Sequence, residues 1–222
     1  ILYCFLRFKG IKVRLFLDVT TSKVDKSLLR DLITLVPPSK EVLKVRQTAT
    51  GYSKQSQVEC NIVANYIRGV ARKYNATSYD VMYTFPKELV KPNRKNGKKI
   101  RPKSFIEYKT PRLSCDGNVL VDDDGNIVYD NHSCWLYSGC RATNKYSFKW
   151  CLIHAFDVYH NVPVEAYLSD YGFAPSRNQV ALSQISQWVW RSRIRKFEPI
   201  VLAISNKHMY DVFVEWLNND NI

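Results

Sequence analysis

The sequence predicts an α+β protein, and three patterns in it indicate this class. Residues 11–17 alternate between apolar and mostly basic side chains, which is typical of a strand with one buried face. Residues 54–74 and 177–197 repeat apolar side chains at helical spacing, which indicates amphipathic helices. The pair Asp124-Gly125 separates two runs of strand-forming residues. We therefore expect an N-terminal β-hairpin and helices, a β-rich middle and a helical C-terminal third.

The N-terminal part begins with two strand-like runs that are separated at Lys9-Gly10. From Asp25 the apolar spacing becomes that of a helix, which Pro37 and Pro38 stop. Ser39 is placed to cap a short helix, and the helix over residues 54–74 follows it. Three helices joined by short turns suit a helical DNA-binding subdomain, and they equally suit ordinary globular packing.

The C-terminal part is expected to resume as a strand at residues 104–109 and to form a hairpin over residues 118–130. Further elements are then expected: helices over 146–160, 163–171 and 177–197, a strand over 199–204 and a last helix over 207–217. We expect no internal repeat.

A connector rich in Pro, Lys and Asn interrupts this pattern at residues 87–103. It divides the chain into an α+β region (1–86) and a region of β-hairpins followed by helices (104–222). One continuous domain is also compatible with the same pattern.

The charge of the chain points to a polyanion as its partner. Lys and Arg number 33 against 20 Asp and Glu, so the formal net charge is +13. Such an excess attracts anions, of which nucleic acid is the usual one and an anionic membrane surface the second. No stretch is apolar for the roughly 18 residues that a membrane span requires. The six cysteines are widely scattered, which favours reduced thiols inside a cell. We expect a protein of the host cytoplasm or nucleus, or of a virion.

Part of this charge is concentrated in the connector. Seven basic residues fall between residues 90 and 103 with no acid among them: Lys91, Arg94, Lys95, Lys98, Lys99, Arg101 and Lys103. A polar loop of this kind can lie along a phosphate backbone and release its counterions. A solvated surface loop and a nuclear-import signal have the same composition.

A second basic group follows from the helix expected over residues 177–197. At 100° per residue, Arg177, Arg191 and Arg195 share one stripe of that helix, next to its apolar face. The stripe could contact phosphates, with Trp188 nearby for stacking. Alternatively, arginines near a helix C-terminus complement the helix dipole.

Two metal sites are conceivable from the residue types. His132, Cys134, Cys140 and His154 fall within 23 residues and could hold a structural zinc ion, although the chain has no Cys-x-x-Cys pair. Glu107-x-Lys109 resembles the local pattern of metal-dependent endonucleases of the restriction-enzyme type, in which Asp80 could supply the second carboxylate for a catalytic Mg²⁺.

A further stretch looks like the opening half of some phage HNH endonucleases. The matching positions are Cys134, Trp135, Gly139, Tyr146, His154 and Pro163. The half that carries the catalytic histidine and metal ligands of that family has no counterpart here, since no His or Cys occurs between Pro163 and His208. The resemblance implies a DNA-binding relic without nuclease activity.

These observations favour a non-enzymatic, basic nucleic-acid-binding protein that contacts mainly the phosphate backbone and needs no cofactor. Its composition, rich in Asn, Lys, Ile and Tyr, is compatible with a viral or mobile-element origin. The alternatives are the metal-dependent endonuclease with Glu107 and Lys109, and a structural or assembly protein with a basic interaction face.

Overall fold

The computed structural model describes the backbone of most of the chain. The described residues are 2–8, 11–17, 26–45, 47, 57–84, 107–139, 144–158, 166–167, 169–172 and 176–219. The basic connector therefore lies outside the described residues, as does Cys140.

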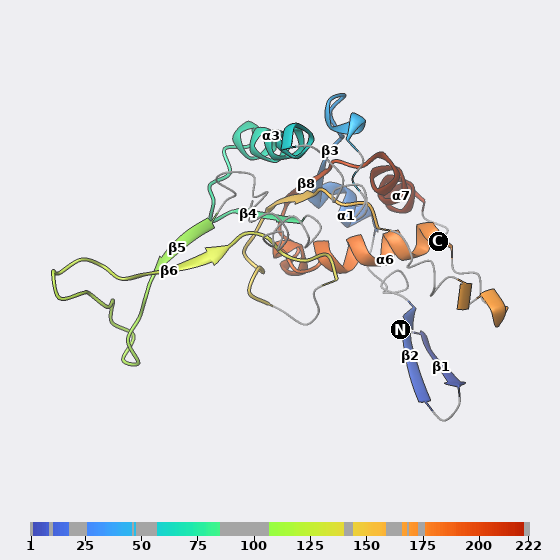
Figure 1. The fold of residues 1–222 in the computed structure, drawn as a ribbon, viewed down its shortest axis with the longest axis horizontal. Coiled ribbons are helices and arrows are strands. Elements are labelled where there is room, and N and C mark those ends of the chain that lie inside the picture. The colour runs from blue at the N-terminus through green and yellow to red at the C-terminus, as the bar shows by residue number, and fades with distance from the viewer. Residues whose placement is uncertain are drawn as a thin grey trace.

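A four-stranded parallel sheet forms the centre of the molecule (Figure 1). Its strands are β3 (Ile33–Val36), β8 (Ile200–Ile204), β7 (Cys151–His154) and β4 (Val81–Thr84), in that spatial order. Every residue of β4, β7 and β8 is buried, because helices cover both faces of the sheet.

Alternate residues of these strands point to two separate apolar cores. On one face, α3 (Gln57–Lys73) packs Val63 and Ile67 against Ile153 and Ala203. On the other face lie α1 (Lys26–Leu32), α6 (Arg177–Val189) and α7 (Lys207–Asn218). Their apolar side chains, with Trp188 among them, surround Met82, Leu152 and Leu202 of the sheet.

The N-terminal hairpin is confirmed. β1 (Leu2–Phe8) pairs with β2 (Ile11–Leu17) in antiparallel register, with Phe8 opposite Ile11 across the expected turn. The helix expected over residues 54–74 and the last helix are also present, as α3 and α7.

Two expected helices are wrong in part because they contain buried strands. The apolar spacing that starts at Asp25 continues past the end of α1 at Leu32, but Ile33–Val36 forms β3. Residues 146–160 were expected to be one helix, and they contain β7 instead. His154, the histidine of the HNH-like stretch, therefore ends a strand and does not begin a helix. β7 is fully buried and therefore lacks the alternation that would distinguish it from a helix, whereas the buried residues of β3, Ile33 and Val36, have helical spacing.

The helix expected over residues 177–197 ends earlier, at Val189. A short 3-10 helix, η2 (Arg193–Lys196), follows and leads into β8. Arg191 and Arg195 consequently do not extend a helical stripe from Arg177.

A long excursion, which we name the finger (residues 107–133), leaves the sheet between β4 and β7 and projects from the rest of the molecule (Figure 1). Its root is a two-stranded antiparallel sheet of β5 (Glu107–Pro111) and β6 (Tyr129–Ser133). Beyond this root the chain makes two tight turns, at Gly117 and Gly125, each glycine with φ of 81°. The turn expected at Asp124-Gly125 is thus confirmed.

The two turns belong to a short internal repeat, although the sequence pattern predicted no repeat. Residues 112–119 (RLSCDGNV) and 120–127 (LVDDDGNI) share Asp-Gly-Asn at the same places. Three backbone hydrogen bonds join the equivalent positions in a cycle: Arg112 N–H to Val128 O, Leu120 N–H to Arg112 O, and Val128 N–H to Leu120 O.

The predicted fold class is confirmed, since helices and strands combine in one structure around the parallel sheet. The sheet takes β3 and β4 from residues before the connector, and β7 and β8 from residues after it. In the part of the chain that the structure describes, no helix has the length and hydropathy needed to cross a membrane.

Candidate nucleic-acid interface

The clearest concentration of described basic side chains is a turn that follows α6. We name residues 191–197 the basic turn, because Arg191, Arg193, Arg195 and Lys196 fall within six positions. Arg195 and Lys196 are exposed, and Arg191 and Arg193 are half-buried. Glu198 is the acid nearest in sequence, and its carboxylate lies 3.9 Å from Nε of Arg193.

Buried residues inside the basic turn hold its backbone in place. The Ser192 hydroxyl donates to the carbonyl of Val189 at 2.7 Å and caps η2 by accepting from the N–H of Ile194. Ile194 is fully buried in the core shared by α6 and α7. The N–H of Arg193 donates to the carbonyl of Lys149, just before β7. The turn is thereby fixed at the amino edge of the sheet, with Arg195 and Lys196 on the outside.

Phe197 stands out in the basic turn because its backbone is left-handed, with φ of 56° and ψ of 37°. Glycine or asparagine usually occupies this position after a helix, because a side chain crowds the backbone there. A bulky residue in this conformation costs about 1–2 kcal/mol. Phe197 is also 53% exposed, so burial does not offset this cost. Strain of this kind is characteristic of functional positions.

Neighbouring groups orient two of the arginines. Nε of Arg193 donates to the carbonyl of Pro199 at 2.6 Å, and its guanidinium lies 5.6 Å from the ring centroid of Trp150. The guanidinium of Arg195 donates to the side-chain oxygen of Asn144. Guanidinium groups held in this way lose less conformational entropy when they bind phosphates.

The structure separates the predicted basic residues into distinct places. Arg191 and Arg195 both lie in the basic turn, as neighbours in one short segment. Arg177 begins α6 and therefore lies about 18 Å away along the helix axis, toward the opposite edge of the sheet. The connector residues, from Lys91 to Lys103, lie outside the described residues.

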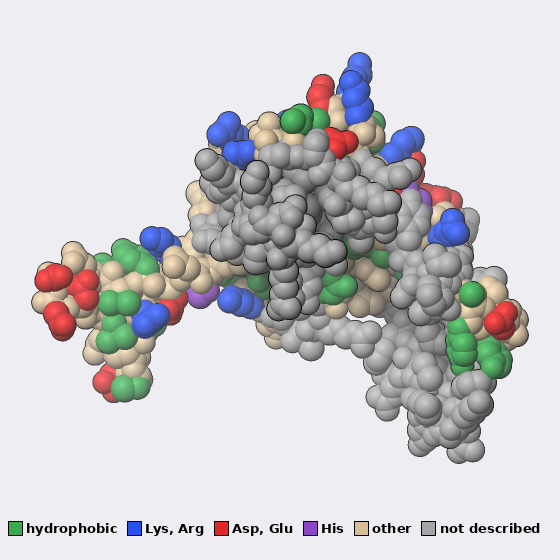
Figure 2. Space-filling model, in the orientation of Figure 1, with side chains coloured by type: hydrophobic (Ala, Val, Ile, Leu, Met, Phe, Trp, Pro, Cys, Tyr) green, Lys and Arg blue, Asp and Glu red, His purple; other side chains and the backbone are tan. Residues whose placement is uncertain are grey.

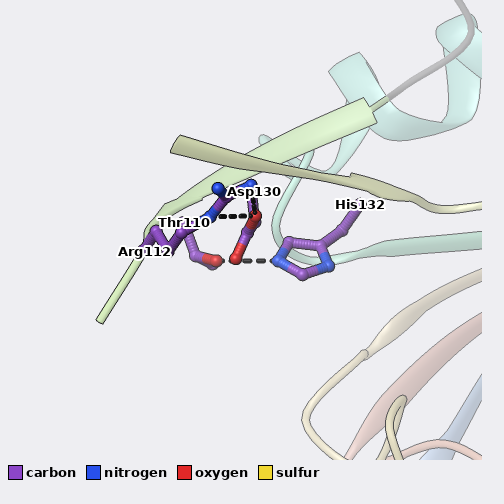
Figure 3. A network of polar contacts seen from close by, with 4 residues as sticks. All are labelled: Thr110, Arg112, Asp130 and His132. Atoms are coloured by element: carbon purple, nitrogen blue, oxygen red, sulfur yellow. Dashed lines mark hydrogen bonds and ion pairs between the residues drawn. The ribbon is translucent and has the colours of Figure 1, made fainter. Parts of the chain in front are cut away.

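Two of the predicted zinc ligands, His132 and Cys134, are held by other contacts. His132 accepts from or donates to the Thr110 hydroxyl at 2.7 Å within the finger, next to the Arg112–Asp130 ion pair (Figure 3). The thiol of Cys134 contacts the carbonyl of Ser78 at 3.1 Å. Across the described ranges, no group of three His, Cys, Asp or Glu side chains could hold a metal ion. Since Cys140 lies outside these ranges, the zinc site stays a prediction.

The residues of the predicted nuclease site lie near the root of the finger. Glu107 and Lys109 belong to β5, opposite Ser133 and Asn131 of β6. Burial favours a higher pKa for Asp80, but hydrogen bonds from the hydroxyl and N–H of Thr77 outweigh it and lower the pKa below its usual range. The Asp80 carboxylate thus acts as a turn-forming group before β4, and the endonuclease stays a prediction.

The carboxyl edge of the sheet carries a separate polar cluster. β3 leads toward α3 on one face and β8 leads to α7 on the other, and open parallel sheets bind ligands at such a point. Here Gln47 donates to the carbonyl of Ser205 at 2.9 Å. The buried carboxylate of Asp157 lies 3.0 Å from Nδ1 of His208, whose Nε2 faces the Asn178 side chain at 3.1 Å. These groups form hydrogen bonds with one another, so the cluster is well ordered. The cluster does not indicate which ligand could bind there.

Two neighbouring side chains at the same edge are buried without hydrogen bonds of good geometry. Thr84 and His154 are partners in adjacent strands, and both are fully buried. Burial lowers the pKa of His154 to about 3, an effect that the backbone of Phe156 opposes only weakly. The ring stands edge-on to Trp188 and is therefore a neutral core residue.

Sequence reasoning missed Arg193, Lys196 and Phe197 as members of the basic turn. The run RSRIRKF was visible, but a helix extended to residue 197 placed Arg193 and Lys196 outside the stripe of Arg191 and Arg195. The left-handed backbone of Phe197 has no sequence signature at all.

A parallel sheet with helices on both faces defines a Rossmann-like domain. In agreement, the family model described as the YonV C-terminal Rossmann-like domain matches residues 27–217. The chain belongs to this family.

Among curated proteins, the chain is similar to the SPbeta prophage-derived uncharacterized protein YonV of Bacillus subtilis (strain 168). The two are 31% identical over 85 residues, which are 38% of this chain and 21% of that protein. The matched region thus spans about a fifth of the length of that relative. No solved structure gives a significant match.

Proposed function

We propose that this domain is a nucleic-acid-binding module that contacts mainly the phosphate backbone, and that the basic turn is its principal described contact surface. The observation that carries the proposal is the exposed Phe197, on a left-handed backbone, in a segment with four cations. Phosphates bind guanidinium and ammonium groups, and unpaired bases stack on exposed aromatic rings. The basic turn offers both kinds of group within seven residues.

The net charge supports this proposal from another direction. The formal charge of +13 raises the local concentration of any polyanion, independently of which residues finally contact it. Similarity to a prophage-derived protein is compatible with a mobile-element origin, where nucleic-acid binding is a common need. The connector residues Lys91–Lys103 would add phosphate contacts to those of the basic turn.

The proposal is tested by fluorescence anisotropy with labelled single- and double-stranded DNA and RNA over a series of salt concentrations. The variant carries Arg195→Gln and Lys196→Gln, which remove two exposed cations. With double-stranded DNA, we expect the slope of log affinity against log salt to become shallower by about 1.8, because each lost phosphate contact changes it by about 0.9. The four nucleic acids distinguish the preferred type.

A matched control removes two exposed cations from the opposite face of the sheet, by Arg72→Gln and Lys73→Gln on α3. This control should weaken binding less than the basic-turn variant does. Salt-independent or undetectable binding by the unmutated chain would overturn the proposed function. An equal loss in both variants would show that general charge, and not the basic turn, provides the affinity.

A further inference from the structure

The finger projects away from the parallel sheet and its helices, which we name the body. Despite this exposed position, the finger carries an apolar surface. Six large apolar side chains of the finger are between 37% and 58% exposed: Leu113, Val119, Leu120, Val121, Ile127 and Tyr129. Figure 2 shows green and red side chains close together on the projecting finger. Contiguous apolar surface on a protruding element is typical of protein interfaces.

The charge of the finger is opposite to that of the rest of the chain. The finger contains six carboxylates and two cations, so its formal net charge is −4, while the other residues of the chain sum to +17. An acidic surface of this kind repels nucleic acid and attracts a basic protein surface. The charge of the finger therefore favours a protein partner with a basic face.

The finger is also well ordered internally, so binding requires little further ordering of its backbone. Ser114 and Asp122 occupy equivalent places in the repeat, and each accepts from the N–H of the asparagine four residues later, at 3.2 Å and 2.8 Å. The guanidinium of Arg112 holds the Asp130 carboxylate through two contacts, at 2.6 Å and 2.8 Å (Figure 3). Preorganised surfaces lose less entropy on association.

We propose that the finger of one molecule docks on the basic body of a second copy of this chain. The same chain carries both complementary charges. The finger has a net charge of −4, whereas the described residues of the body, from 26 to 219 without the finger, hold 15 Lys and Arg against 9 Asp and Glu, a net charge of +6. Contact between two fingers would oppose acid to acid and is disfavoured. A finger-to-body contact joins two different surfaces, so it can repeat from molecule to molecule and build an open row. This inference goes beyond the proposed function and does not depend on it.

Sedimentation velocity without nucleic acid tests the proposal, at protein concentrations up to roughly 100 µM, where weak interfaces become populated. The unmutated chain should sediment faster as its concentration rises. This increase should shrink when the salt is raised from about 50 mM to about 500 mM, because salt screens complementary charges. A chain that sediments as a monomer at every concentration in low salt would overturn the proposal, and would assign the finger to a different occupant.

Two independent finger variants keep the test falsifiable if one of them folds poorly. Leu120→Ser with Val121→Ser removes apolar contact, and Asp116→Asn with Asp123→Asn removes two exposed charges that hold no turn. Both should abolish the concentration dependence. Lys109→Gln, which changes an exposed side chain of the finger but keeps its acidic and apolar residues, is the control and should leave the concentration dependence intact.

Replacement of Val119 by a photo-crosslinking amino acid identifies the surface on which the finger docks. Crosslinks from position 119 should map to the body of the other molecule. Crosslinks between two fingers would overturn the finger-to-body arrangement. No nucleic acid is present in the sedimentation or the crosslinking experiment. The outcomes of both are therefore independent of whether the basic turn binds phosphates.

Discussion

The ammonium group of Lys149 lies 3.9 Å from the ring centroid of Tyr108. Lys149 precedes β7 in the body, whereas Tyr108 belongs to β5 at the root of the finger. The same ammonium donates to the carbonyls of Ser78 and Tyr79, so one buried lysine joins the loop before β4 to the finger. A lysine with no exposed surface is unusual. Here carbonyl oxygens, aromatic rings and the sulfur of Cys134 surround its ammonium group.

We predict that Lys149→Met destabilises the domain at neutral pH and loosens the root of the finger. The change removes the hydrogen bonds from the ammonium to the part-buried carbonyls of Ser78 and Tyr79, of which Ser78 keeps the Cys134 thiol as a second partner. Loss of these charge-assisted hydrogen bonds costs about 1–3 kcal/mol in the free energy of unfolding. Urea denaturation measures this cost, and hydrogen exchange shows whether residues 107–111 lose protection. Lys207→Met, which breaks only an exposed ion pair with Asp211, is the control and should have little effect.

The same lysine predicts a difference in pH dependence. Burial lowers the pKa of Lys149 from 10.5 to about 8, although the nearby Cys134 and Asp80 oppose this effect. Between these values the unfolded chain holds a proton that the native protein has released, so rising pH favours the native state. The free energy of unfolding of the unmutated protein, relative to that of Lys149→Met, should therefore increase between pH 8 and 10.5. A constant difference over this range would contradict the lowered pKa.

We predict that the buried His154 makes the stability of the protein sensitive to acid. Its pKa is about 3 in the native protein and 6.5 in the unfolded chain, so protonation below pH 6.5 favours unfolding. His154→Leu should change the stability little at pH 7, because the ring has no strong hydrogen bond to lose. Below pH 6 the unmutated protein should lose about 1.4 kcal/mol per pH unit relative to the variant. Parallel pH profiles of the two proteins would show that His154 is not the acid-sensitive group.

We predict that substitution of Phe197 affects nucleic-acid binding but not stability. Phe197→Gly removes the left-handed strain, so the free energy of unfolding should stay within about 1 kcal/mol of the unmutated value or rise. Nucleic-acid affinity should nevertheless fall by roughly five- to a hundredfold, the range expected for loss of one stacked ring. Phe197→Tyr keeps the ring and should retain the affinity. If Phe197→Gly binds as tightly as the unmutated chain, the ring is not a contact.

The elements that the sequence predicted well are those with one solvent-facing side. In α7, buried Met209, Val212 and Phe213 alternate with exposed or half-exposed residues, so the helical period is visible. In β7, by contrast, all four residues are buried, including the polar His154, so no alternation of apolar and polar residues marks the strand. β3 was taken as the end of a helix for a different reason: its buried residues, Ile33 and Val36, are three positions apart, which is also a helical spacing.

The candidate interface was predicted in part for a related reason. Charge is a property of composition, so Arg191 and Arg195 could be identified without knowledge of the fold. Their grouping with Lys196 depends on the end of α6 at Val189, which the sequence does not mark with Gly or Pro. The finger was recognised only as a turn, because the sequence does not show that its apolar residues would lack a core to enter.

The position of β8 determines when the sheet can form. Among the described strands, β8 is the last in the chain, and it lies between β3 and β7. Until residue 204 is available, β3 lacks its described neighbour and β7 keeps an open edge, so a growing chain cannot complete its core. The contact of β3 with β8 closes a loop of more than 160 residues, and loops of this length slow folding. A chain truncated before residue 200 would therefore expose two unpaired strand edges, where other chains can add.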